Sequence, residues 1–195
     1  IVSKYINLMR KKIIITGGLG YIGTELCKIY SGVSWHHHIM VLDNRFISER
    51  VNQIRNWNME FIHGDILDKE LINKHFKNAD VVHHLAGITS VPRTKSESSR
   101  EQDEKIKLVA EKGTQNILNA ISNECKLIFP STHVVYEGIS EVRKDIKEDE
   151  STQPVLSYSL SKAANEKQLR DSGKNYVILR LGSVYGYSND TMRID

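Results

Sequence analysis

The chain has few of the residues that cross-link or interrupt a fold. Its 195 residues include two cysteines, three prolines and 7% aromatic residues. Cys27 and Cys125 lie far apart, so the sequence offers neither a disulfide framework nor a paired-cysteine metal site. We expect both thiols to be buried, free and reduced in a cytoplasmic protein. No apolar run approaches the ~20 residues that span a membrane, and none is predicted to do so.

An excess of one charge is also missing. The 27 basic and 24 acidic residues give a net charge of +3, spread evenly along the chain. This balance does not favour binding to nucleic acid or to a membrane surface. With 39% hydrophobic and 26% charged residues, the composition is that of one globular domain with its own core. Residues 1–10 lack an initiator methionine at the start and the apolar core of a signal peptide, so we expect a disordered lead-in or read-through there.

Short apolar segments alternate with amphipathic segments from residue 12 onward. The expected strands are 12–16, 39–43, 59–65, 79–87, 126–132 and 175–186. The expected helices follow the first strand, with Ile22, Leu26 and Ile29 on one face, and then occupy 48–55, 68–75, 98–122 and about 157–171. Such alternation predicts a doubly wound, parallel α/β sheet with helices on both faces. Ligands of these sheets bind beyond the carboxyl ends of the strands.

A glycine-rich turn, TGGLGYIG, joins the first strand to the first helix. Gly17 permits a tight turn, Gly20 lets the backbone approach a pyrophosphate, and Gly23 lets the helix pack close to the strand. Asp43 ends the second strand, where its carboxylate can bind the adenosine ribose and repel a 2′-phosphate. The pattern predicts a dinucleotide site at a helix N-terminus and favours NAD over NADP, although nearby Arg45 would tolerate a phosphate.

Further short segments follow the glycine turn in a recognisable order: LDN, GDI, HLAG, GTQN, PSTHVVY, YSLSK and RLGSVYG. Together with that turn they resemble the extended short-chain dehydrogenase/reductase family, especially its nucleotide-sugar epimerases and dehydratases. The resemblance covers residues 11–186. It implies a Rossmann fold there, with NAD as cofactor, a nucleotide-sugar as substrate, and a homodimer paired through the helices at 98–122 and 157–171. It also implies a C-terminal substrate domain that is largely absent, with 187–195 as its start.

The resemblance also implies roles for individual residues. Tyr158 and Lys162 match its catalytic YxxxK pair, and Thr132 matches its catalytic Ser/Thr, with Ser131 as the alternative. Asn116 would support the lysine through its backbone or a water. The implied cofactor-binding residues are Gly17, Gly20, Tyr21, Ile22, Gly23, Asp43, Asn44, Asp65, Ile66, Leu85, Ala86, Gly87, Asn116, Ser131, Tyr158 and Lys162. The candidates for contact with the substrate are Ser90, His133 and Ser183.

The residues themselves explain why this pair suits redox chemistry. Tyr158 and Lys162 are four residues apart, which places them on one face of a helix. A tyrosine ordinarily titrates near pH ~10, and a neighbouring ammonium and a positive nicotinamide ring both favour its ionised form. Tyr158 would remove a proton from a sugar hydroxyl while the carbon gives hydride to NAD, and Thr132 would orient that hydroxyl. Hydride return to the opposite face gives an epimer, and prior loss of water gives a dehydrated product.

Several departures from the family pattern keep alternatives open. Glu137 stands where relatives have glycine, which is expected to shift the loop near the substrate. Ser183 replaces an asparagine, and Gly87 replaces an alanine. His133-Val134 follow Thr132, where dehydratases often have Asp-Glu. The alternatives are a reductase or decarboxylase of the same family, and a non-catalytic NAD-binding module.

The remaining polar clusters have simpler interpretations. His36–His38 lies at the end of the sheet away from the predicted site and has no spaced partner, so we expect a polar loop and no metal site. His83 and His84 alternate across a strand, so at most one faces a site, and core packing or hydrogen bonding at the sheet end is expected. The charged run EVRKDIKEDE, residues 141–150, reads as a solvated loop.

Overall fold

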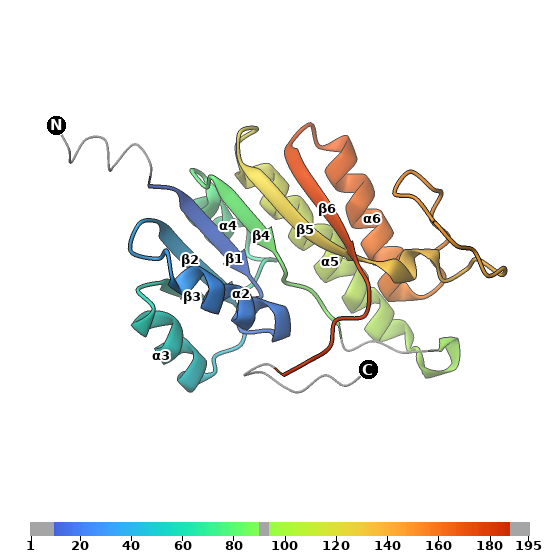
Figure 1. Ribbon diagram of the computed structural model, residues 1–195, viewed down its shortest axis with the longest axis horizontal. Helices are drawn as coiled ribbons and strands as arrows, with labels where there is room; N and C mark the ends of the chain where they lie inside the picture. The colour runs from blue at the N-terminus through green and yellow to red at the C-terminus, as the bar shows by residue number, and fades with distance from the viewer. Residues whose placement is uncertain (1–9, 90–93, 188–195) are drawn as a thin grey trace.

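The computed structural model of the chain describes residues 10–89 and 94–187. Ser90 and residues 188–195 lie outside these ranges, as does nearly all of the predicted lead-in at 1–10. The described strands form one sheet in the order β3-β2-β1-β4-β5-β6, and every neighbouring pair is parallel (Figure 1). They are β1 Lys12–Thr16, β2 His38–Asp43, β3 Glu60–His63, β4 Val81–His84, β5 Lys126–Thr132 and β6 Asn175–Leu181.

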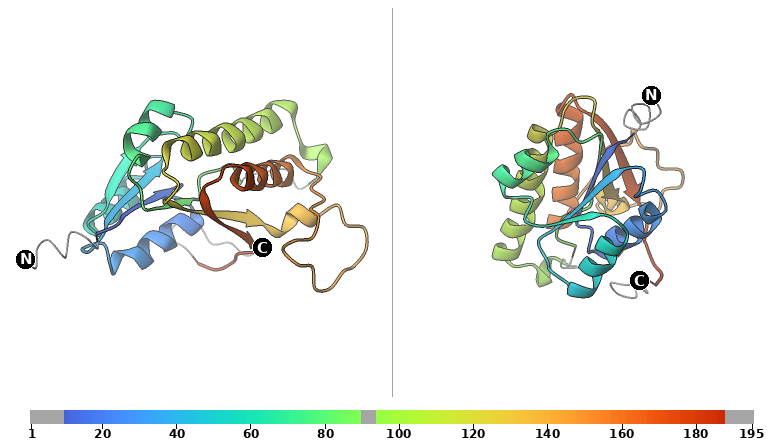
Figure 2. Two further views of the ribbon diagram at one scale, coloured as in Figure 1. Left: turned by 90° about the horizontal axis from the view of Figure 1, so that it is seen from above. Right: turned by 90° about the vertical axis from the view of Figure 1, so that its left-hand side faces the viewer.

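Helices cover both faces of the sheet (Figure 2). Side chains of α2 and α3 pack on one face, and side chains of α4, α5 and α6 pack on the other. The helices are α2 Tyr21–Ser31, α3 Ser48–Asn56, α4 Lys69–Phe76, α5 Arg100–Ala120 and α6 Ser157–Asp171, with short 3₁₀ turns η1 Lys95–Glu97 and η2 His133–Tyr136. The predicted doubly wound parallel fold is therefore confirmed.

Strand β1 shows why this sequence supports two layers of helix. Ile13 and Ile15 point into the core beneath α2 and α3, whereas Ile14 points into the core beneath α4, α5 and α6. Each is at most 4% exposed. Full burial of such a side chain stabilises a fold by about 1.5–3 kcal/mol. A continuous apolar run is consequently suited to a central strand that is covered on both faces.

The ends of several elements differ from the predicted ones. Strands β3 and β4 stop earlier than expected, because their partner strands β2 and β1 end at Asp43 and Thr16. Gly64 donates its amide to Asp43 O at 3.0 Å, and Leu85 donates to Thr16 O at 3.2 Å. The predicted apolar face of α2 is also wrong in part. Ile29 is 74% exposed, and the buried residues of α2 are Gly23, Thr24 and Cys27.

Both cysteines are buried free thiols, as predicted. Burial raises the pKa of Cys27 to about 12 and that of Cys125 to about 11, so neither is a reactive thiolate near neutral pH. Over residues 10–89 and 94–187, the structure contains no helix with the length and apolar character needed to cross a bilayer.

Candidate active site

The glycine turn is built so that side chains cannot be added to it. Gly17 has φ +67°, and a Cβ there would lie 2.8 Å from the Ala86 amide nitrogen. A Cβ on Gly23 would lie 2.3 Å from the Gly17 carbonyl oxygen. Gly20 donates its amide to that same carbonyl at 3.0 Å and precedes α2. The turn thus presents bare backbone and a helix N-terminus, which together suit a pyrophosphate.

Asp43 lies against this turn at the end of β2. Its Oδ2 accepts a hydrogen bond from the Leu19 amide at 2.9 Å, and its side chain is almost fully buried. Its Oδ1 accepts from the Arg45 amide at 2.9 Å and from Arg45 Nε at 3.3 Å. A carboxylate fixed beside the turn fits the ribose of a dinucleotide. The guanidinium of Arg45 lies beside that carboxylate, at the place where the 2′-phosphate of NADP would have to be bound.

A second group of predicted cofactor residues lies on the loop between β3 and α4. Asn44 donates from Nδ2 to Asp65 Oδ2 at 3.0 Å. Asn116 of α5 is buried and donates from Nδ2 to the carbonyl oxygens of Ile66, at 3.0 Å, and Leu67, at 3.2 Å. These two bonds of its amide hold the β3–α4 loop, and support of the lysine by Asn116 stays a prediction. These contacts fix Asp65 and Ile66 next to the end of β2.

Tyr158 and Lys162 share one face of α6. The Nζ atom of Lys162 lies 5.8 Å from the centroid of the Tyr158 ring and 4.5 Å from that of Phe129. It donates a hydrogen bond to the Pro130 carbonyl oxygen at 2.9 Å, which ties it to strand β5. Burial lowers the pKa of Lys162 to about 8, while the charge of Glu166 acts in the opposite direction. The ammonium is therefore still favoured at neutral pH.

Thr132 and Ser131 end strand β5 and differ in their partners. The Ser131 hydroxyl donates to Glu166 Oε1 at 2.6 Å, on the face of the sheet that α6 covers. Thr132 is adjacent in a strand and so points to the other face. Its Oγ1 accepts from the Val134 amide at 3.3 Å, which begins η2 and leaves the hydroxyl proton available for donation. Of the two hydroxyls, Ser131 is the one committed to a buried carboxylate, whereas Thr132 bonds to a backbone amide.

The predicted substrate contacts are at the same end of the sheet but are less enclosed. His133 is exposed, and its Nδ1 lies 3.2 Å from the Leu181 carbonyl oxygen. Ser183 is exposed on the chain that follows β6. Gly87 has open space where a Cβ would stand, so the alanine of relatives would fit there without strain. Ser90 lies outside the described residues.

Comparison with known proteins bears on what these contacts mean. The model of the NAD dependent epimerase/dehydratase family matches residues 13–194. The chain belongs to this family. A dTDP-D-glucose 4,6-dehydratase from Dictyostelium discoideum is 29% identical over 92% of this chain and 45% of its own length. A CDP-paratose 2-epimerase from Salmonella typhi is 31% identical over 90% of this chain and 58% of its own length. The chain spans about half the length of these curated relatives.

Solved structures of nucleotide-sugar enzymes share the family fold. A point mutant of UDP-glucuronic acid 4-epimerase from Bacillus cereus, in complex with NAD and a fluorinated UDP-sugar, gives a TM-score of 0.75 at 27% identity. It is matched over 90% of this chain and 57% of that one. The enzyme WbmG from Bordetella bronchiseptica, in complex with NAD and UDP, gives 0.74 at 26% identity over 91% of this chain and 55% of that one.

Two acidic residues important to the site were not predicted for that purpose. Glu137, noted only as a family departure, accepts hydrogen bonds at Oε1 from the Val155 amide at 2.9 Å and the Leu156 amide at 2.7 Å. The Ser159 hydroxyl donates to the same oxygen. Glu137 therefore holds the two residues that lead into α6, just before Tyr158. No local sequence signal pointed to this role, because Glu137 lies 18 and 19 residues before the two amides that it binds.

Glu166 is the second such residue, and it is fully buried one turn beyond Lys162. It accepts hydrogen bonds from Ser131, from Arg180 Nη2 at 2.7 Å and Nε at 3.0 Å, and from Arg170 Nη2 at 2.8 Å. Burial raises the pKa of Glu166, but the bonds from Arg180 and Ser131 outweigh this and hold the pKa below its ordinary value. Glu166 thus joins α6 to β5 and β6 beneath the predicted catalytic pair.

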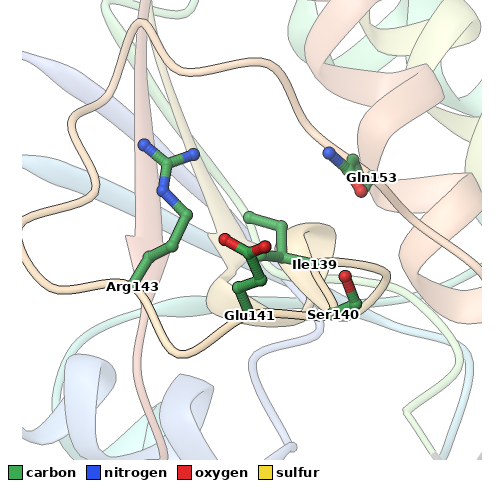
Figure 3. Close-up of a pocket in the computed structure, with 5 residues that line it drawn as sticks. All are labelled: Ile139, Ser140, Glu141, Arg143 and Gln153. Carbon is green, nitrogen blue, oxygen red and sulfur yellow. The ribbon is translucent and has the colours of Figure 1, made fainter.

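Two cavities lie beside these residues. The larger, about 600 Å³, is lined by η2, the following loop and β6, and His133 is the one predicted site residue in its walls. The smaller, about 200 Å³, lies within the loop between η2 and α6. Figure 3 shows Arg143 and Gln153 on separate limbs of that loop, with Ile139, Ser140 and Glu141 between them. Neither cavity contains a residue of the glycine turn.

Proposed function

We propose that this chain carries the NAD-binding and catalytic residues of a nucleotide-sugar epimerase. The observation that carries the proposal is the position of Lys162. Its ammonium lies between the ring of Tyr158 and strand β5 and donates to the carbonyl oxygen of Pro130, which is two residues before Thr132 in sequence. The relatives and solved neighbours, which carry CDP-, dTDP- and UDP-sugar names, support a nucleotide-sugar as the substrate class.

The residues present fit NAD. The backbone of Gly17 and Gly20 and the start of α2 would receive the pyrophosphate, and Asp43 would receive the adenosine ribose. The loop held by Asn116 would flank the adenine through Asp65 and Ile66. When bound, NAD⁺ supplies a hydride acceptor for a sugar carbon. Whether Arg45 turns outward to admit a 2′-phosphate decides the preference for NAD over NADP, and we propose NAD.

The chain's own residues handle the proton and the substrate hydroxyl. Tyr158, as the phenolate, accepts the hydroxyl proton of the sugar carbinol. Lys162 favours that phenolate by its charge, because burial strengthens the attraction between neighbouring ions. Thr132 donates to or accepts from the same hydroxyl and thereby holds it in line with Tyr158. Glu166 and Glu137 hold the strand and helix that carry these groups.

Epimerisation is favoured over dehydration by the residues after Thr132. Elimination of water needs an acid and a base next to the sugar, and the two positions after Thr132 hold His133 and Val134 instead of carboxylates. The nearest following carboxylate, Glu137, already accepts three hydrogen bonds at the start of α6. An oxidised sugar in this site would therefore regain hydride without losing water.

Residues 11–186 are proposed as the NAD-binding domain that also holds the catalytic residues. The substrate-binding site would then be completed by residues beyond 187, in keeping with the greater length of the relatives. This division predicts that the described domain binds NAD by itself and that turnover requires the further segment.

The test is a search for transiently reduced cofactor. The purified chain, and a version extended to the next stop codon of its gene, would be mixed with NAD⁺ and a panel of nucleotide-sugars while the near-ultraviolet absorbance of NADH is followed. One sugar is expected to give NADH and an epimer. Tyr158→Phe should lower the rate at least ~100-fold, since general base catalysis contributes about 10²–10⁴-fold.

Tyr176→Phe is the matched control, because Tyr176 lies on β6 and packs against the core beneath α6. It should leave both NAD⁺ affinity and turnover close to those of the unchanged protein. Turnover that survives Tyr158→Phe would show that the base is wrongly assigned. NAD⁺ binding without reduction by any sugar would favour a non-catalytic module.

A further inference from the structure

A chain of buried hydrogen bonds connects the glycine turn to helix α6, and His84 is at its centre. The Nδ1 atom of His84 lies 3.0 Å from Thr16 Oγ1, and its Nε2 atom lies 2.9 Å from Thr114 Oγ1. Thr16 directly precedes Gly17, and its Oγ1 also accepts from the Ala86 amide at 3.0 Å. This series of hydrogen bonds therefore begins at Thr16 and Ala86, and the backbone of Gly17 packs against that of Ala86.

The other end of the chain reaches the face of α6 that carries the catalytic pair. Asn165 donates from Nδ2 to Thr114 Oγ1 at 3.0 Å and to the Ala110 carbonyl at 2.9 Å. Tyr158, Lys162 and Asn165 stand at positions i, i+4 and i+7, which form one stripe of a helix. The contact that fixes Asn165 consequently fixes the rotation of the same stripe that presents Tyr158 and Lys162.

Every side chain of this hydrogen-bonded chain is shielded from water. Thr16 and Thr114 are 0% exposed, and His84 and Asn165 are 2% exposed. Within the described residues no buried side-chain nitrogen or oxygen lacks a partner. A buried polar group costs free energy once its partner is removed, so each link constrains the geometry of the next.

The surroundings keep His84 neutral, and a neutral ring can bond to both hydroxyl partners. Burial first, and then the nearby positive charge of Lys162, lower the pKa of His84 to about 3. The rings of His84 and Phe129 are 5.7 Å apart, and Lys162 Nζ lies over the Phe129 ring. A neutral imidazole has one donor and one acceptor nitrogen, so it can donate to one threonine hydroxyl and accept from the other.

We propose that His84 is a positioning residue that sets the catalytic face of α6 relative to the glycine turn. It acts through Thr114 and Asn165 on one side and through Thr16 on the other, and it need not touch substrate or cofactor. The link to catalysis rests on the proposed function, whereas the coupling between turn and helix can be measured without any cofactor.

Adjacent His83 provides a matched control. It is also buried, at 8% exposure, and its Nε2 lies 2.8 Å from the Tyr30 hydroxyl. It points to the opposite face of β4, toward α2, and is outside the chain of bonds to α6. Replacement of His83 thus removes a similar buried contact from the same strand without breaking the proposed connection.

The experiment compares amide hydrogen exchange in five variants of the whole chain without cofactor. His84→Asn places an amide near the former Nδ1 position, so it retains a partner for Thr16 and loses Thr114. His84→Gln reaches toward the former Nε2 position and does the reverse. Exchange should become roughly two- to tenfold faster in 157–165 for His84→Asn and in 16–20 for His84→Gln, as expected for one lost net hydrogen bond.

His83→Asn should lower overall stability without a selective change in 157–165. Thr114→Val breaks the same link from the other side and should reproduce the effect of His84→Asn, and the double variant should add little to either. Equal or uniform acceleration of exchange in the His83 and His84 variants would overturn the proposal, as would full additivity in the double variant.

Turnover separates this proposal from the proposed function. If the epimerase assignment is correct, His84→Asn should lower kcat several-fold while NAD⁺ affinity changes little, because the glycine turn keeps its partner. Selective exchange in 157–165 with no turnover in any protein would refute the epimerase assignment and leave the positioning role intact. Unchanged kcat beside normal exchange would refute the positioning role alone.

Discussion

At the scale of single residues, Gly17 and Gly173 share a backbone conformation but not an environment. Both have φ +67°, a region that side chains rarely adopt. A Cβ on Gly173 would have no neighbour within 4 Å, whereas one on Gly17 would overlap the backbone of Ala86. The two positions therefore separate backbone strain from the shape of the cofactor turn.

We predict that Gly173→Ala destabilises the fold by about 1–2 kcal/mol, the cost of the left-handed conformation, and leaves NAD⁺ affinity unchanged. Gly17→Ala carries the same strain plus the overlap with Ala86, and it should also reduce NAD⁺ affinity by more than about tenfold. Urea unfolding and calorimetric titration measure the two effects. Equal loss of NAD⁺ affinity in both variants would mean that strain alone matters.

Residues whose role depends on local sequence were predictable, and residues whose role depends on distant partners were not. The glycine turn follows from spacing alone, and Tyr158 and Lys162 follow from helical spacing together with the family motif. For His84 the sequence predicted core packing or hydrogen bonding at the sheet end but not the partners, because Thr16 and Thr114 lie 68 and 30 residues away. Glu166 was missed for the same reason, since Ser131 and Arg180 reach it from two strands.

At the scale of elements, the start of helix α6 depends on a side chain from outside the helix. Glu137 accepts from the amides of Val155 and Leu156 just before the helix, whereas Asp68 is the N-cap of α4 and accepts from the Leu71 amide at 3.0 Å. Both carboxylates hold the start of a helix, but only Glu137 is next to Tyr158. The two residues therefore distinguish a contact that only stabilises a helix start from one that also serves the site.

We expect Asp68→Ala to cost about 1 kcal/mol of folding free energy, which is typical for a lost cap. Glu137→Ala should cost a similar amount through its lost hydrogen bonds. Glu137→Ala alone should reduce kcat in the extended protein, because the first turn of α6 carries Tyr158. Thermal unfolding and initial-rate kinetics provide the comparison. A Glu137→Ala variant with normal kcat would show that the first turn of α6 keeps its geometry without the Glu137 side chain.

The existence of the strands followed from composition, whereas their ends did not. β3 and β4 were expected to extend to residues 65 and 87, yet they end at His63 and His84. The next residues, Gly64 and Leu85, make one last bond each to Asp43 and Thr16, where the partner strands end. The length of a strand thus depends on its partner in the sheet, which the apolar pattern along the sequence does not show.

At the scale of the whole molecule, two buried histidines make the fold sensitive to acid. Burial lowers the pKa of His83 to about 4 and, with help from Lys162, that of His84 to about 3. Both values lie below the ordinary 6.5, so the unfolded chain binds protons first as the pH falls. Their contribution to stability is complete above pH 6.5 and is lost progressively toward pH 4 and below.

We predict that the free energy of unfolding drops by about 4 kcal/mol between pH 7 and pH 5, or roughly 2 kcal/mol for each of these histidines. Urea unfolding at the two pH values measures the difference. His84→Gln should roughly halve it, since one of the two buried rings is then gone. Burial also lowers the pKa of the less buried His75, but that contribution is common to both proteins. The pKa of Glu166 is lowered, so its contribution to stability is lost mainly below the ordinary glutamate pKa of 4.5. Such carboxylates therefore do not mask the effect of the histidines between pH 7 and pH 5. Equal stability at pH 7 and pH 5 would contradict the buried, neutral state of both rings.

The most direct test of the whole account is the structure of the chain bound to NAD⁺. We predict the pyrophosphate against Gly17 and Gly20, and the Tyr158 and Thr132 hydroxyls facing the hydride-accepting carbon of the nicotinamide. The space between them should admit one sugar carbinol, with reacting atoms about 3–3.5 Å apart. A nicotinamide ring placed elsewhere, or a Tyr158 side chain directed away from that carbon, would contradict the proposed chemistry.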